Sequence, residues 1–587
     1  MNRCESDILI ALTKEKYRNQ RELAKACGCS LGSINSSVKK LIDEAYLDEK
    51  MELTVKAEKM FNERKPKSAI ILAAGVGMRM VPINTEIPKA LLEVKGETLI
   101  ERTIKQLHEA GIRKIYVVVG YKKDEFEYLI DQYDVKLIVN EEYAKKNNLH
   151  SLKLALNYLS NSYIIPCDVW CKDNPYQQKE LYSWYMVSDE LNKGSYVRVN
   201  RKMELVETNG ELFGNQMIGI SYLQEKEAAI VRANVEKMCN EQRYDNTFWE
   251  ETLWEKNKFI VQGKVVEKEC VTEINTYEQL RELDHDSNQL ETDSISIISN
   301  VFGVDAEEIR EITVLKKGMT NRSFLFSCKN KKYIMRIPGE GTDQLINRTE
   351  EGQVYRVIAD KHICDDIAYI NPQNGFKITA FIEGARVCDP FNPDDVKKSM
   401  KRLKEFHEME LEVEHTFDIY KQIDFYESLW AGNHSVFRDY ETTKEKVFSL
   451  KSYIESHVDK RVLTHIDAVP DNFLFVKNEQ GEEEIRLIDW EYAGMQDPHV
   501  DIAMFCIYAM YERKQVEQLI DAYFTEGCPA ETRIKIYCYI AVCGLLWSNW
   551  CEYKRILGVE FGEYSLRQYR YAKEYYKIVK EELEALK

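Results

Sequence analysis

The N-terminal 64 residues place their apolar side chains at a helical spacing, with short polar breaks between the runs. This pattern predicts a short helix over Gln20–Cys27 and, after a break at Gly28, a longer helix that begins at Ser30. Residues 46–53 then alternate between apolar and polar, which predicts a small hairpin before one last helix. We therefore expect residues 1–64 to fold as a small helical module.

After this module the pattern becomes that of a parallel α/β sheet. Apolar runs at residues 69–72 and 114–119 indicate strands buried on both faces, and residues 100–110 indicate the helix between them. A proline between two lysines at residues 65–67 ends the preceding helix and reads as a linker. We expect the second domain to span residues 68–284.

A polar, acidic stretch at residues 284–293 leads to a third pattern. Strands are expected around residues 312–326 and 332–337, and a long aromatic-rich helical region follows them. A small β-rich lobe before a larger α-rich lobe predicts a two-lobed domain over residues 294–587. The predicted fold class is therefore multidomain, with α/β and α+β parts.

The length of 587 residues fits several globular domains better than a single hydrophobic core. Apolar residues make up 44% of the chain and charged residues 30%, which argues against bulk disorder. A net charge of −17 makes the whole chain a poor binder of nucleic acid, although one domain could still present a basic face.

The sequence shows neither a secretory signal nor a membrane span. The longest apolar run, residues 536–547, is too short to cross a bilayer and reads as a buried helix. The fifteen cysteines are an odd number without zinc-site spacing, so free thiols in a reducing cytosol explain them best. We expect a cytoplasmic protein without membrane insertion, and the sequence leaves its oligomeric state open.

The order of helix, turn, helix and hairpin in residues 1–64 resembles a winged helix-turn-helix. In that family the second helix enters the major groove of DNA, which would make a reading face of Ser33, Asn35, Ser36, Lys39 and Lys40. Only two lysines lie on that helix. A docking or dimerising module without DNA contact is therefore an equally good interpretation.

A glycine loop follows the first strand of the second domain, within LAAGVGMRMVPINTEIPKALLEV at residues 72–94. Glycines after a strand let backbone N–H groups approach a phosphate, although a tight turn alone would also explain them. Two cations that could balance a triphosphate, Arg79 and Lys89, make the nucleotide interpretation more specific. The expected nucleotide-binding loop comprises Ala73, Ala74, Gly75 and Gly77.

This loop, with KGETLIERTIKQLHEAGIRKIYVVVGY at residues 95–121, resembles the nucleotidyltransferase family that makes nucleotide-sugars and CDP-alcohols. NEEYAKKNNLHSL at residues 140–152 is similar to the phosphocholine cytidylyltransferase branch. The resemblance implies a Rossmann-like fold and attack of a substrate phosphate on the α-phosphorus of CTP, with Lys89 and Arg79 as catalytic cations. It also implies nucleotide contacts from Asn147, Asn148 and Ser151.

The same resemblance implies a Mg²⁺ site. Asp168, directly after an apolar strand, matches the family's metal-binding aspartate at the end of a strand. The family usually has a second aspartate in a phrase like EIDT, where this chain has EINT at residues 273–276. Asn275 therefore takes that position, and its neutral oxygen is expected to hold Mg²⁺ less strongly.

Two phrases in the third domain carry the strongest signal, THIDAVPDNFLF at residues 464–475 and LIDWEYAG at residues 487–494. Phosphoryl transfer to an alcohol needs a carboxylate that faces the hydroxyl and two oxygen ligands for Mg²⁺. Asp467 would be the catalytic base, and Asn472 and Asp489 the metal ligands. The two phrases resemble the aminoglycoside and choline kinase group, which implies a two-lobed protein-kinase-like fold.

The upstream lobe agrees with this resemblance. KGMTNRSFLF at residues 317–326 is similar to the group's phosphate loop, which implies nucleotide contacts from Gly318, Thr320 and Asn321. Arg336 lies where many kinases have a lysine, and Glu351 is its expected ion-pair partner.

Aromatic side chains point to the acceptor of the phosphoryl group. Trp547 and Trp550 lie three residues apart in LLWSNWCEYKRI, and this spacing alone favours ordinary core packing. The family resemblance instead implies a choline-binding wall, to which Tyr492 would add, because a quaternary ammonium is held by cation–π contact. A carboxylate that some choline kinases place after Asp501 is absent, so choline versus ethanolamine stays open.

Together these observations predict a bifunctional enzyme. It would phosphorylate choline with ATP and then transfer CMP from CTP to phosphocholine, for phosphocholine decoration of a bacterial surface polymer. One alternative is the same pair of domains acting on ethanolamine or a sugar phosphate. Another is a DNA-binding regulator that uses the catalytic domains as ligand sensors.

Overall fold

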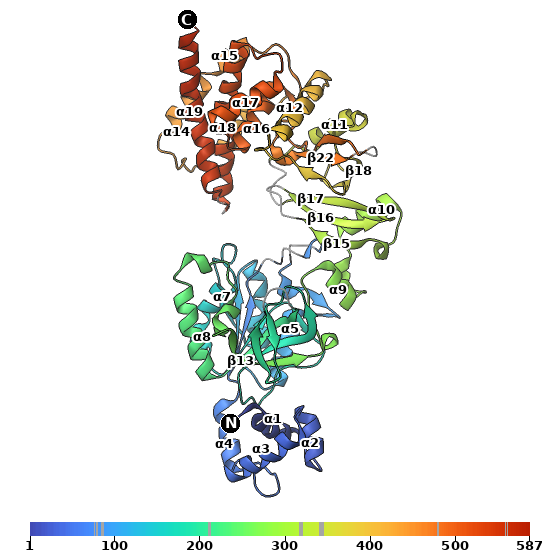
Figure 1. Ribbon diagram of the computed structural model, residues 1–587, viewed down its shortest axis with the longest axis vertical. Helices are drawn as coiled ribbons and strands as arrows, with labels where there is room; N and C mark the ends of the chain where they lie inside the picture. The colour runs from blue at the N-terminus through green and yellow to red at the C-terminus, as the bar shows by residue number, and fades with distance from the viewer. Residues whose placement is uncertain are drawn as a thin grey trace. The chain divides into compact units, whose positions relative to one another are not determined.

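The computed structural model describes residues 1–75, 77, 80–83, 87–208, 213–315, 321–339, 345–477, 481–557, 559 and 561–586. The chain divides into two compact units, Met1–Ser296 and Ile297–Lys587, and each is described by itself. The division falls within helix α10 (Asp293–Phe302), which follows the acidic stretch. Figure 1 shows the helices and strands of both units.

The first 64 residues form four helices: α1 (Arg3–Lys14), α2 (Gln20–Cys27), α3 (Leu31–Asp43) and α4 (Val55–Arg64). Gly28 ends α2 in the left-handed region at φ +60°, and the Ser30 side chain caps the start of α3. The hairpin expected over residues 46–53 is reduced to a single bridge between Leu47 and Leu53. The Thr54 N–H donates to the Tyr46 carbonyl as a ladder bond of this bridge, and the Met51 N–H closes the turn on the Asp48 carbonyl, which leaves few residues for a longer ladder.

This helical module shares its hydrophobic core with the α/β part of the same unit. Leu181, from the loop that leads into the central sheet, is 2% exposed and packs in the module's own apolar cluster. The neighbouring Tyr182 hydroxyl donates to Asp7 at 2.9 Å, and the Arg64 guanidinium donates to the Leu181 carbonyl at 3.3 Å. The module is therefore packed against the α/β part rather than tethered to it.

A ten-stranded sheet forms the centre of the α/β part, in the order β5-β4-β1-β6-β11-β8-β13-β10-β9 with β12 beside β13. Strands β5, β4, β1 and β6 are parallel, and β11 reverses the direction. The strands are β1 (Ser68–Ala73), β4 (Ile115–Val119), β5 (Lys136–Val139), β6 (Ser162–Pro166), β8 (Trp184–Asn192), β9 (Val197–Val199), β10 (Glu204–Glu207), β11 (Gly214–Leu223), β12 (Trp254–Glu255) and β13 (Lys258–Val266).

Helices cover both faces of this sheet, α5 (Leu99–Glu109) on one face and α7 (Asn148–Leu154) with α8 (Glu225–Met238) on the other. Alternate residues of β1 join the two cores, with Ile71 on the α5 side and Ile70 on the α7 side. Every residue of β1 is buried, which is the reason for its unbroken apolar sequence.

A small second sheet positions the later part of the domain. Strand β7 (Val169–Cys171) pairs in antiparallel register with β14 (Val271–Glu273), and the Ile274 N–H donates to the Asp168 carbonyl at 2.8 Å. Residues about a hundred positions apart in the sequence are thereby joined immediately beside the end of β6.

The second unit begins with an antiparallel sheet of five strands in the order β15-β16-β17-β19-β18. The strands are β15 (Arg310–Val314), β16 (Asn321–Cys328), β17 (Lys331–Pro338), β18 (Ile367–Ile370) and β19 (Lys377–Ala380). Helix α11 (Arg348–Ile358) lies between β17 and β18 in the chain. The two strand regions expected in the sequence are present as the three strands β15, β16 and β17.

Helices make up most of the rest of this unit, as Figure 1 shows. The long ones are α12 (Pro393–Glu408), α13 (Ile419–Ser428), α16 (His499–Tyr508), α17 (Arg513–Tyr523), α18 (Ala530–Ile556) and α19 (Glu563–Ala585). Among the described helices, α18 alone has the length and composition of a membrane span, but 94% of its most apolar window is buried inside the unit. It is the central helix of the core, against which α13, α16 and α19 pack.

Candidate active sites

The α/β unit has a cavity of about 290 Å³ at the carboxyl ends of β1 and β6. Parallel strands commonly present their ligand-binding loops at this edge. Most of the residues predicted for the nucleotide site line it: Ala74, Gly75, Gly77, Lys89, Asn147, Asn148, Ser151, Asp168 and Asn275. Ala73 does not, because it is the buried last residue of β1, and Arg79 lies outside the described residues.

Lys89 is the centre of the polar contacts in this cavity. Its Nζ donates to Asp168 Oδ2 at 2.5 Å and to Asn275 Oδ1 at 2.7 Å. Gly77 passes close to it with φ +68°, and a Cβ there would come within 3.1 Å of the Lys89 Cβ. Glycine is therefore required both by the backbone conformation and by the lysine.

Asp168 and Asn275 have side-chain oxygens that could bind a divalent cation in this cavity. Asp168 Oδ2 and Asn275 Oδ1 both lie within hydrogen-bond distance of one ammonium nitrogen, so the two oxygens converge on a single point. Carboxylate and amide oxygens are suitable ligands for Mg²⁺. Asp168 and Asn275 thus fit a shared cation, with one negative charge between them.

The segment before α7 is fixed by its polar side chains. Asn147 caps the helix by accepting from the Asn148 N–H, and the Asn148 side chain accepts from the Trp249 N–H at 2.8 Å. Ser151 accepts from Asn140 at 3.0 Å. These bonds hold the segment against the cavity, where Lys146 adds a cation that the sequence analysis did not single out.

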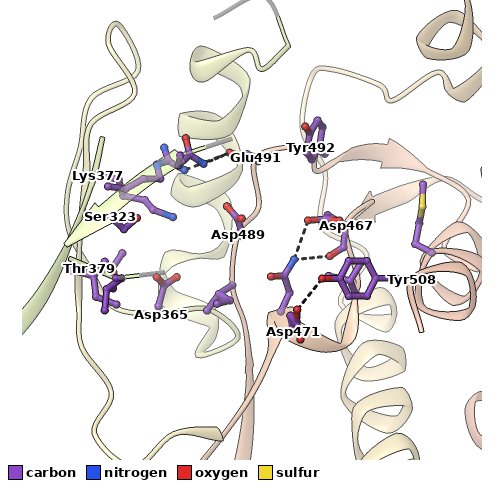
Figure 2. A pocket seen from close by; sticks show the side chains of 18 of the residues that line it. Ser323, Asp365, Lys377, Thr379, Asp467, Asp471, Asp489, Glu491, Tyr492 and Tyr508 are labelled. Atoms are coloured by element: carbon purple, nitrogen blue, oxygen red, sulfur yellow. Dashed lines mark hydrogen bonds and ion pairs between the residues drawn. The ribbon is translucent and has the colours of Figure 1, made fainter. Parts of the chain in front are cut away.

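The second unit has a cavity of about 400 Å³ lined by the small-lobe sheet, the catalytic-loop phrases and the helical lobe. The predicted residues Asn321, Arg336, Asp467, Asn472, Asp489, Tyr492, Trp547 and Trp550 all line it, and Figure 2 shows several of them. Gly318 and Thr320 lie outside the described residues.

Asp467, Asn472 and Asp489 face one another across this cavity. The Asn472 amide donates to the Asp467 carboxylate at 3.0 Å and to its backbone carbonyl at 2.8 Å (Figure 2). Burial raises the pKa of Asp467 well above its ordinary value, and the charges of Asp489 and Glu491 raise it further. Burial also raises the pKa of Asp489, against the influence of Lys377 and Arg336. A cavity with this excess of buried acid fits a divalent cation.

Asp501 supports the catalytic loop, a role that the sequence analysis did not assign. It is fully buried, and its carboxylate accepts from the His465 N–H at 2.9 Å and the Ile466 N–H at 2.7 Å. His407 Nε2 lies 3.0 Å from the same carboxylate. Asp501 therefore fixes the backbone immediately before Asp467.

Arg336 and Glu351 form the expected ion pair. Both Nη nitrogens of Arg336 contact the Glu351 carboxylate, at 2.5 and 2.8 Å, and Arg348 joins it at 3.0 Å. Burial alone would raise the pKa of Glu351, but the Arg336 charge and its hydrogen bonds lower it to about 2. Arg348 also lies 3.3 Å from Glu491, whose pKa burial and Asp489 raise to about 7.

Aromatic rings form the wall of the cavity near Asp467. Tyr492 and Trp547 meet edge to face with 5.9 Å between ring centroids, and Trp547 and Trp550 do so at 5.6 Å. Tyr508 and Tyr564 complete the wall, and the Tyr508 hydroxyl donates to Asp471 at 2.8 Å. Asp471 lies within the quoted phrase at residues 464–475 but was not predicted as a site residue, and Tyr564 lies outside every quoted motif.

Two protein-family models match this chain, one in each of its two units. Residues 69–179 match the MobA-like NTP transferase domain, and residues 312–538 match the choline/ethanolamine kinase family. Choline-phosphate cytidylyltransferase of Streptococcus pneumoniae is 30% identical over 230 residues, 37% of this chain and 96% of that protein.

Two further relatives are each similar to a part of this chain. 2-Aminoethylphosphonate cytidylyltransferase of Lancefieldella rimae is 30% identical over 237 residues, 37% of this chain and 92% of that protein. Protein LicA of Haemophilus influenzae is 26% identical over 268 residues, 43% of this chain and 96% of that protein. The chain therefore belongs to the family of choline-phosphate cytidylyltransferases and their relatives, and it is a fusion of such a domain with a choline kinase-like domain.

Proposed function

We propose that the chain converts choline to CDP-choline in two steps, phosphorylation by ATP and then transfer of CMP from CTP. The observation that carries the proposal is the aromatic wall of Tyr492, Trp547 and Trp550 in the same cavity as Asp467. Such a wall suits a quaternary ammonium, which cannot donate hydrogen bonds. The product of the kinase site would be phosphocholine. This phosphate monoester is the substrate of choline-phosphate cytidylyltransferase, to which the other domain is similar.

In the kinase step the choline hydroxyl oxygen attacks the γ-phosphorus of ATP, and the bond to ADP breaks. Asp467 would take the hydroxyl proton, because its carboxylate lines the same cavity as the aromatic wall and lies beside Asn472. Asn472 and Asp489 would hold Mg²⁺, which neutralises charge on the phosphates when bound. Asn321 and the Arg336–Glu351 pair hold the small lobe around the nucleotide.

In the second step a phosphocholine oxygen attacks the α-phosphorus of CTP, and pyrophosphate leaves. Lys89 and Arg79 are proposed to stabilise the charge that develops on the α-phosphate and the leaving group. The backbone of Ala74, Gly75 and Gly77 would receive the phosphates, and Asn147, Asn148 and Ser151 would contact the nucleoside. Asp168 and Asn275 would hold Mg²⁺, as their convergent oxygens allow.

The full chain with choline, ATP, CTP and Mg²⁺ tests this function directly by mass spectrometry. ATP-dependent CDP-choline is the expected product. Formation of phosphocholine without CDP-choline would contradict the proposed cytidylyltransferase step. A product formed only from ethanolamine or 2-aminoethylphosphonate would show that choline is not the substrate.

Trp547→Ala is expected to raise the KM for choline roughly 30-fold, because a desolvated cation–π contact contributes about 2 kcal/mol. Trp547→Phe keeps an aromatic face and should raise it far less. Steady-state kinetics with choline and with ethanolamine measure both. An unchanged KM for choline would favour an acceptor whose N–H groups form hydrogen bonds, such as ethanolamine.

Asn275→Asp is expected to lower the Mg²⁺ concentration for half-maximal cytidylyltransferase activity on the order of tenfold, because it adds a second negative charge beside Asp168. A Mg²⁺ titration with CTP and phosphocholine measures this. The Mg²⁺ dependence of choline phosphorylation by the same variant is the control. If the titration curve does not move, Asn275 is not a metal ligand.

For residues 1–64 we propose the winged helix-turn-helix arrangement, supported by the order of α2, α3 and the bridged segment before α4. Their surface favours docking over DNA contact. Lys40, one of the two lysines of α3, stays half exposed but is paired with Glu5 at 2.9 Å, which offsets its positive charge. A salt-dependent gel shift with the full chain separates the two interpretations.

We further propose a cytoplasmic location and a role in phosphocholine decoration of a bacterial surface polymer. All fifteen cysteines are free thiols, as a reducing compartment would keep them.

A further inference from the structure

Two cations lie side by side on the small-lobe sheet of the kinase unit. Arg336 on β17 and Lys377 on β19 are direct cross-strand partners, and both line the cavity that contains Asp489. They are 5% and 6% exposed. Only Arg336 is expected from the sequence to serve the nucleotide, so the structure raises the question of which cation meets the phosphates.

The Arg336 guanidinium is already committed to protein partners. Both Nη nitrogens contact Glu351, and one of them also donates to the Gly375 carbonyl at 3.0 Å. A bidentate, buried pair of this kind is costly to separate, because each charge would be left without its partner. Arg336 therefore holds α11 against the sheet, and among the described residues only its Nε is left without a hydrogen-bond partner.

Lys377 is differently placed. Its Nζ donates to the Tyr355 hydroxyl at 2.6 Å, a neutral group on α11. Among the described residues this ammonium has no direct ion-pair partner, although its charge acts on Asp489 and Glu351 from farther away. A buried ammonium without a close counter-ion is expensive, so an anion that enters the cavity would be bound strongly.

The surroundings indicate which anion. Lys377 and Asp489 lie on facing sides of the cavity, with Asp365 beside them (Figure 2). Two acids alone would repel an anion. A polyphosphate that carries a divalent cation presents the metal to Asp489 and its own oxygens to Lys377, which satisfies both charges.

We propose that Lys377 contacts the phosphates of the nucleotide in the kinase site, as a second cation beside Arg336. The inference rests on the proposed kinase function but concerns the nucleotide alone. Tyr355 fixes the ammonium between β19 and α11, and Arg336 acts through Glu351 as a positioning residue.

Lys377→Gln tests the proposal, because it keeps a hydrogen-bond donor for Tyr355 and removes the charge. The affinities of the full chain for ADP and for adenosine are measured by calorimetry with Mg²⁺ present. The ratio of the two affinities should fall roughly 10- to 100-fold, the range for loss of a charged hydrogen bond, while adenosine binding stays within about twofold. Lys331→Met, an exposed lysine of the same sheet, is the matched control.

The outcomes separate cleanly. An unchanged ratio of ADP to adenosine affinity in Lys377→Gln overturns the proposal. Lys377→Arg keeps a cation and should retain most of the ratio of ADP affinity to adenosine affinity. If this ratio falls as far in Lys377→Arg as in Lys377→Gln, the result also contradicts a charge contact. Failure of the unaltered chain to bind ADP would overturn this inference and the kinase function together. ADP binding without choline phosphorylation would leave the inference standing and remove only the acceptor.

Discussion

Replacing Asp467 with asparagine is expected to lower kcat for choline phosphorylation roughly a thousandfold, the usual range for loss of a general base. The asparagine keeps the size of the side chain and its contact with Asn472, so the loop should stay in place. A coupled assay for ADP release with saturating choline measures the effect. The KM values for ATP and choline should change little, because Asp467 is proposed to act on the proton rather than to bind either substrate.

Two controls define this result. Asp459→Asn alters an exposed carboxylate shortly before the catalytic loop and should leave kcat unchanged. The formation of CDP-choline from added phosphocholine and CTP, which uses the other unit, should also persist in the Asp467 variant. If Asp467→Asn phosphorylated choline at the normal rate, the assignment of the catalytic loop would be wrong.

Replacing Lys89 with methionine is expected to lower kcat/KM of the cytidylyltransferase step by roughly two to three orders of magnitude. The lysine ammonium is the group on which Asp168 and Asn275 converge. Its loss removes a fixed cation from the cavity where the triphosphate is proposed to bind. The rate of pyrophosphate release from CTP and phosphocholine measures the effect.

An exposed lysine of the same unit provides the comparison. Lys136→Met on strand β5 removes an exposed charge from the same sheet and should keep full activity. Choline phosphorylation by the Lys89 variant reports on the integrity of the other unit. Full cytidylyltransferase activity of Lys89→Met would show that the charge on the leaving group is stabilised elsewhere.

Residues in short, ordered phrases were predicted from the sequence, because a loop of fixed length places them in one site. Asp467, Asn472 and Asp489 illustrate this, since the loop and the following hairpin bring them to the same cavity. The Arg336–Glu351 pair was predicted in the same way and confirmed by its contacts.

Several residues that reach the site through tertiary packing, and that no quoted motif contains, were not predicted. Lys377 lies beside Arg336 only because β19 pairs with β17 in one particular register, and a shift of one residue would turn its side chain to the other face. Asp501 reaches the catalytic loop from α16, and Tyr508 follows on the same helix. Neither pairing register nor helix position leaves a local signal in the sequence.

The same limit applies to the fold. Helices α2, α3 and α5 and strands β1 and β4 followed from the apolar pattern, whereas α1 was not predicted and the hairpin over residues 46–53 did not form beyond one bridge. Alternation of apolar residues describes which side chains are buried, and a short segment can bury them without a ladder. The apolar pattern around Leu181 did not predict that this side chain would pack in the core of residues 1–64.

The position of Leu181 limits how freely evolution, or an engineer, can exchange the front of this protein. A side chain from the catalytic domain's own loop completes the apolar core of residues 1–64. A cut at residue 65 would expose this leucine and remove the two partners, Asp7 and Arg64, that hydrogen-bond to Tyr182 and to the Leu181 carbonyl. The helical module therefore cannot be exchanged for an unrelated domain without loss of packing, because a replacement domain would need an apolar pocket for Leu181.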